Sequence, residues 1–143
     1  MPVLIWLSLI FIGSTDLLSA EHTSRIIGPI LRWLDPTISA ASIARVQFFV
    51  RKTGHVIEYA ILAGLLWRAL RLGTGWQAKM SILFLAAGFV SAFFAATDEF
   101  HQSFVPSRTS SPTDVMIDIA GALISLTICV VVAWRKGPKE NHV

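Results

Sequence analysis

A chain of 143 residues with 54% hydrophobic and only 15% charged residues is too apolar for an ordinary soluble domain. Its mean hydropathy of +0.64 predicts an integral membrane protein, and its net charge of +3 fits cations at helix ends better than a nucleic-acid surface. With Cys129 as its single cysteine, the chain cannot form an internal disulfide.

Four apolar segments approach the length of a membrane-spanning helix, which needs about 20 residues. They cover residues 3–18, 53–70, 80–97 and 112–134. The first could be read as a signal peptide, but it lacks a basic leading region and Leu18 suits a cleavage site poorly, which favours a retained helix. The sequence therefore predicts an all-α polytopic membrane protein, with four transmembrane helices in a single domain over residues 1–143.

The connector between the first two segments, residues 19–52, has a helical pattern of its own. Its apolar residues fall on one helical face, namely Ile26, Ile27, Ile30, Leu31 and Leu34. This pattern predicts an amphipathic helix lying in the membrane interface, ended by Asp35-Pro36. From about Ser39 we expect the chain to run helically into the second membrane segment.

Small residues recur every four positions in three of the segments, as they do where membrane helices pack closely. The set comprises Ala60, Gly64, Ala87, Gly88, Ser91, Ala92, Ala95, Ala96, Gly121 and Ser125. We expect these positions to form packing seams between the helices. The fourth segment also has a well-defined start, because Ser111-Pro112-Thr113-Asp114 places an N-cap serine before a proline and an acid.

Charge asymmetry between the connectors predicts the orientation. If all four segments cross the membrane, both termini lie on the same side of it as the connector that holds Arg68, Arg71 and Lys79. The positive-inside rule then puts the termini in the cytoplasm of a multi-pass protein of the plasma membrane. Five cations in the long connector argue for the opposite orientation, namely Arg25, Arg32, Arg45, Arg51 and Lys52.

Ionisable side chains interrupt this apolar chain, and charge at membrane depth is expensive and usually functional. Helical spacing groups them into stripes on three segment ends that meet at one membrane face. The stripes are Arg51, Lys52, His55 and Glu58, then Asp98, Glu99, His101 and Gln102, then Asp114 and Asp118. Together with Arg108, whose planar guanidinium suits a phosphate or carboxylate, they predict a polar pocket at the interface.

Structural roles stay open for several of these residues. Asp114 is the third residue of a capped helix and can serve backbone amides. His55 and Glu58 can pair with the basic residues one turn earlier. Asp118 lies about 6 Å deeper than Asp114 and needs a partner. Tyr59 is expected to be an interfacial or packing aromatic.

Three motifs occur in order in the second part of the chain. They are Arg51-Lys52-Thr53-Gly54-His55-Val56-Ile57-Glu58-Tyr59, then Asp98-Glu99-Phe100-His101-Gln102 with Val105-Pro106-Ser107-Arg108, then Asp114-Val115-Met116-Ile117-Asp118-Ile119-Ala120-Gly121. Together they resemble the VanZ-like family of small bacterial membrane proteins, most strongly over residues 51–125. Ser107 stands where that family usually has glycine.

The resemblance implies a protein of the bacterial cell envelope. The family's namesake is linked to reduced sensitivity to the glycopeptide teicoplanin, which makes antibiotic resistance an expectation here. The family as a whole has no established reaction. The resemblance therefore implies where a site lies and assigns no catalytic role to its residues.

The first functional hypothesis is a binding protein that handles a lipid-linked or cell-wall head group in an extracytoplasmic interfacial pocket. Its partners would be membrane lipids or a lipid-linked cell-wall precursor, not nucleic acid. The predicted binding residues are Arg51, Lys52, His55, Glu58, Asp98, Glu99, Gln102, Arg108, Asp114 and Asp118.

Two other hypotheses stay open. An intramembrane hydrolase or transferase acting on a polyprenyl-phosphate-type lipid would draw its acids and bases from His55, Glu58, Asp98, Glu99, His101 and Asp118. Alternatively, the polar residues hold the bundle together as a scaffold for a membrane partner. No cofactor is predicted, and no metal ion, because no recognised metal motif such as His-Glu-x-x-His occurs.

Overall fold

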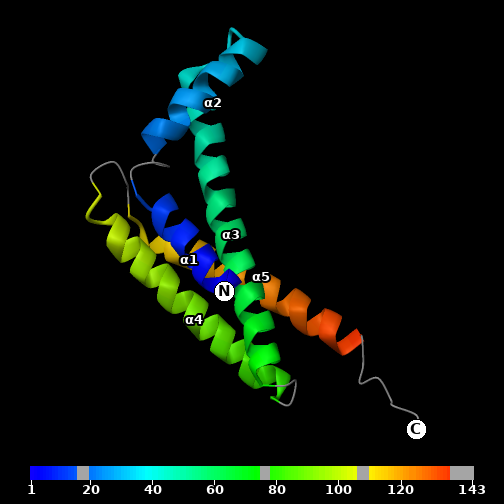
Figure 1. Ribbon diagram of the computed structural model, residues 1–143. Coiled ribbons are helices and arrows are strands. Elements are labelled where there is room, and N and C mark those ends of the chain that lie inside the picture. The colour runs from blue at the N-terminus through cyan, green and yellow to red at the C-terminus, as the bar shows by residue number, and fades with distance from the viewer. Residues whose placement is uncertain (16–19, 75–77, 106–109, 136–143) are drawn as a thin grey trace.

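The computed structural model describes residues 1–15, 20–74, 78–105 and 110–135, with the side chains of residues 20–24 left aside (Figure 1). Five helices make up this part of the chain: α1 (Pro2–Gly13), α2 (Ala20–Leu34), α3 (Ala40–Gly73), α4 (Met80–Gln102) and α5 (Pro112–Arg135). The described residues contain no strand. The prediction of an all-α fold is confirmed.

Helix α3 is the centre of the arrangement. It packs against α1, α4 and α5, most extensively against α5, and α4 in turn packs against α5. Helix α2 contacts α3 as well, and Figure 1 shows that α2 and the beginning of α3 extend beyond the other helices. The fold is therefore a helical bundle with one long helix projecting from it.

The turn between α2 and α3 forms as its sequence predicts. Helix α2 ends at Leu34, and the Asp35 carboxylate then accepts hydrogen bonds from the hydroxyl and the amide of Thr37, at 2.7 and 2.9 Å. The bond from the hydroxyl, with that from the amide, holds the pKa of Asp35 below its usual value. Ser39 caps α3 by accepting the amide of Ser42 at 3.1 Å, after which the helix continues to its end without a break.

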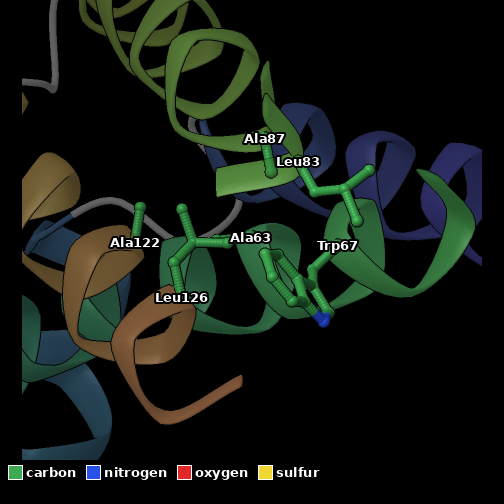
Figure 2. Packing of buried hydrophobic residues seen from close by; sticks show 6 residues of the cluster. All are labelled: Ala63, Trp67, Leu83, Ala87, Ala122 and Leu126. Carbon is green, nitrogen blue, oxygen red and sulfur yellow. The ribbon is translucent and has the colours of Figure 1, made fainter. Parts of the chain in front are cut away.

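Alanine, leucine and tryptophan side chains form the apolar core at one end of the bundle. Figure 2 shows the six buried residues of this core, which come in pairs from α3, α4 and α5: Ala63 and Trp67, Leu83 and Ala87, and Ala122 and Leu126. Ala87, Ser91 and Ala95 are fully buried along one face of α4. This row of the predicted seam therefore faces the interior, whereas Ala96 of the neighbouring row is exposed.

Helices α3 and α5 approach each other closely at Gly121. A Cβ atom placed there would lie 2.4 Å from the carbonyl oxygen of Val56 on α3, so a side chain does not fit without a shift of backbone. Farther along the same contact, a Cβ atom at Gly64 would meet the Ser125 hydroxyl at 3.2 Å. Close packing of α3 against α5 therefore depends on small residues, as predicted.

Two of the four predicted spanning segments are supported by the structure. Helices α4 and α5 are long and apolar enough to cross a membrane, and only 22% of the most apolar stretch of each is buried. Helix α1 has 12 residues, fewer than the roughly 17 needed. Helix α3 has 34 residues, but His55, Glu58 and Arg68 lower the hydropathy of its apolar part. The prediction of four spans is therefore wrong for these two helices by length and composition.

Candidate functional site

An ion pair joins the start of α5 to α3. The ammonium group of Lys52 binds the Asp114 carboxylate, and the two side chains are 17% and 2% exposed. The helix start is capped by Ser111, whose hydroxyl accepts the amide of Thr113 at 3.2 Å. The Asp114 carboxylate therefore pairs with a cation. The sequence alone suggested a different role for it, as a cap for backbone amides.

One turn farther into the bundle, a histidine and a carboxylate meet. His55 Nδ1 lies 3.1 Å from Asp118 Oδ1, and both side chains are buried. Asp118 thus has the partner that its depth requires. The partner of His55 is Asp118 on another helix, and not the Arg51 or Lys52 considered from the sequence. Arg51 and Glu58 are half-buried on the same helix.

Asp98 forms a second hydrogen-bonded group at the end of α4. Its carboxylate accepts from Gln102 Nε2 at 2.8 Å, as the four-residue helical spacing predicts. The hydroxyl of the buried Ser14, just after α1, donates to the other oxygen. The His101 ring contacts Phe11 of α1, with the ring centroids 4.7 Å apart and the ring planes tilted by 37°.

Ser14 is a member of the site that the sequence did not identify. It ends an apolar helix, and a lone hydroxyl at a helix end is a common feature without special meaning. Only the packing of α1 beside α4 brings it to Asp98.

Glu99 ties the end of α4 to the segment that leads into α5. Its side chain is buried, and Oε2 accepts the amide of Ser111 at 2.9 Å. Its backbone carbonyl accepts the Ser110 hydroxyl at 3.0 Å. The predicted convergence of three polar stripes is therefore present in the structure, with Glu99 at the junction between two of them.

A pocket of about 570 Å³ opens beside this cluster, between α1, α3 and α4. Its walls are mainly apolar, and its polar lining consists of Ser8, Tyr59, Thr97, Asp98 and His101. Tyr59 is fully buried among core residues, which agrees with the packing role considered from the sequence. The hydroxyl of Tyr59 and Nδ1 of His101 are buried without a hydrogen-bond partner among the described residues.

The remaining predicted residue, Arg108, lies outside the described residues, as does the neighbouring Ser107. The contact of Arg108 with an anionic group therefore stays a prediction. Within the described part of the chain, the site is rich in buried carboxylates: Asp98, Glu99, Asp114 and Asp118. Such a site can accept hydrogen bonds from hydroxyl, amide and ammonium groups, or bind a cation.

Comparison with known proteins adds one finding. A family model described as VanZ/LLP1 matches residues 1–133, which extends beyond the three motifs to include α1 and α2. No curated protein and no solved structure matches the chain.

Proposed function

This chain belongs to the VanZ/LLP1 family, and on that premise we propose that it is a membrane protein that binds the polar head group of a lipid-linked cell-wall compound. The pocket between α1, α3 and α4 would hold the ligand. Its location in the bacterial plasma membrane, with cytoplasmic termini and an extracytoplasmic pocket, is part of the proposal.

The outer surface of the bundle supports a membrane location. Large apolar side chains point outward along the two most apolar helices, including Phe89, Phe93, Ile124 and Ile128. A soluble protein would bury such side chains or gather them at an interface, whereas lipid tails solvate them without cost. We also infer that α2 lies in the interface, since Ile26 and Ile30 on its apolar face are exposed.

The observation that carries the proposal is a pair of buried, unpartnered polar atoms on two residues that line the pocket. The Tyr59 hydroxyl and His101 Nδ1 are buried and lack partners within the described structure, while the surrounding walls are apolar. Buried polar groups are normally satisfied, and an unsatisfied one costs about 1–3 kcal/mol. A ligand with a polar head and an apolar chain would satisfy both atoms and cover the apolar walls.

The test is the affinity of the purified protein for a lipid-linked disaccharide cell-wall precursor in detergent. We expect Tyr59→Phe to raise the dissociation constant about five- to tenfold, because one hydrogen bond of about 1 kcal/mol is lost. The same change removes an unsatisfied hydroxyl from the free protein, so its melting temperature should be unchanged or higher. Asp98→Asn should also weaken binding.

Ser103→Ala is the matched control, because it removes an exposed hydroxyl just beyond the end of α4, outside the pocket lining. It should leave the affinity unchanged. Equal affinity of the wild-type protein and Tyr59→Phe would reject the proposed pocket. Equal binding of an ordinary phospholipid would reject a preference for cell-wall compounds.

The link to teicoplanin is proposed as a cellular consequence of this binding. Cells that express the wild-type chain should be less sensitive to teicoplanin than cells that express Tyr59→Phe at the same level. The hydrolase, transferase and scaffold hypotheses stay predictions, and release of product from a polyprenyl phosphate by the purified protein would favour an enzyme.

A further inference from the structure

Three buried side chains from three helices meet deep in the polar cluster. His55 of α3, Glu99 of α4 and Asp118 of α5 each offer a donor atom, and these three atoms lie within 4.8 Å of one another. The residues are 8%, 4% and 0% exposed. Their separation along the chain explains why no contiguous metal motif appears in the sequence.

Two oxygen atoms in this trio have no partner. Glu99 Oε1 and Asp118 Oδ2 are buried and form no hydrogen bond with the described residues. The second oxygen of each carboxylate is held in place, Glu99 Oε2 by the Ser111 amide and Asp118 Oδ1 by His55. For Glu99 this is the arrangement of a metal ligand, in which an outer hydrogen bond orients the carboxylate and leaves one oxygen for the ion.

The histidine can join the same ion. His55 Nδ1 lies 3.1 Å from Asp118 Oδ1, a separation that two ligands of one ion can have. With the proton of the neutral ring on Nε2, the lone pair is on Nδ1, and either ring nitrogen can bind a metal. A bound ion would then take the place of the direct contact between His55 and Asp118.

Charge balance also favours a cation. Two ionised carboxylates in an apolar bundle are strongly unfavourable unless they are neutralised. The neighbouring ammonium of Lys52 is already bound to Asp114. A divalent ion would neutralise both carboxylates and satisfy both unpartnered oxygens at once.

We propose that His55, Glu99 and Asp118 bind a divalent metal ion, with Zn²⁺ preferred. Imidazole nitrogen and carboxylate oxygen are both zinc ligands, and three protein ligands leave a fourth position open. Zinc bonds of about 2.0–2.2 Å place two donor atoms at most roughly 4.4 Å apart, so the three side chains need to draw together only slightly. Mn²⁺ should bind the same residues more weakly.

The proposal goes beyond head-group binding and does not depend on it. The test uses the full-length protein in detergent, without added lipid, stripped with chelator and titrated with Zn²⁺ alone. We expect about one ion bound per chain and a melting temperature that rises with Zn²⁺ concentration, because the ion joins three helices of the folded state. Co²⁺ in place of Zn²⁺ should give the visible absorption of a protein-bound ion.

Glu99→Gln and Asp118→Asn should each lower the Zn²⁺ affinity by at least about tenfold, since each removes a ligand rather than an outer contact. Asp98→Asn is the matched control: it changes a buried carboxylate adjacent in sequence to Glu99 that is not part of the trio. It should retain Zn²⁺ while weakening head-group binding, which separates failure of one proposal from failure of the other. The metal-site proposal is rejected if the wild-type protein binds neither Zn²⁺ nor Mn²⁺ and gains no stability from either ion. It is also rejected if Asp98→Asn and Glu99→Gln lose Zn²⁺ affinity equally.

Discussion

Replacing Lys52 with methionine is expected to lower the free energy of unfolding by about 3–5 kcal/mol. Methionine fills a similar volume but removes the ammonium group that binds Asp114. The Asp114 side chain is only 2% exposed, so its charge would stay in the bundle without a counterion. The measurement is thermal or denaturant unfolding of the purified protein in detergent, followed by circular dichroism.

A second substitution tests that cause directly. Adding Asp114→Asn to the Lys52→Met variant removes the isolated charge, so the double variant should be more stable than Lys52→Met alone. If Lys52→Met unfolds like the wild-type protein, the pair contributes nothing to stability. If the double variant is no more stable than the single one, lost packing rather than the buried charge explains the effect.

Gly121→Ala should destabilise the bundle by about 1–3 kcal/mol, the usual cost of an added methyl group in a filled interior, or more. The new Cβ would meet backbone atoms of Val56 rather than a flexible side chain, so one helix has to move. Val56 follows His55, and Gly121 lies one turn after Asp118. The same substitution should therefore separate His55 from Asp118 and weaken binding of Zn²⁺ along with stability.

Gly54→Ala on α3 is the control, since nothing lies within 4 Å of the Cβ that it would add. Alanine is favoured over glycine inside a helix by about 0.5–1 kcal/mol, so this variant should be as stable as the wild-type protein or more so. Equal melting temperatures for Gly121→Ala and the wild-type protein would contradict the close approach of α3 and α5.

Helical spacing was sufficient to predict contacts within one helix and the end of the bundle where the polar residues lie. The bond between Asp98 and Gln102 is of this kind, because residues four apart share a helical face. The partners across helices could not be predicted, since they depend on the depth and rotation of one helix relative to another. Lys52 meets Asp114 and His55 meets Asp118 for that reason.

The sequence predicts more spanning helices than the structure supports, because each apolar segment looks like a span when the polar residues within it are given little weight. Residues 53–70 look like a span when the sequence is read linearly, yet His55, Glu58 and Arg68 lie within them and lower their hydropathy. The length of the third segment is underestimated instead. Helix α4 continues to Gln102, so the acidic residues lie on its last turn. A helix end is set by tertiary contacts as well as by composition.

The length and continuity of α3 have a mechanical consequence. A 34-residue helix is roughly 50 Å long, well over the 30 Å or so of a hydrocarbon core, and this one contains no proline. Its projecting end contacts α2, and Lys52 and His55 join it to α5. One unbroken helix therefore connects α2 to the buried carboxylates, so a displacement of α2 has a direct structural route to them.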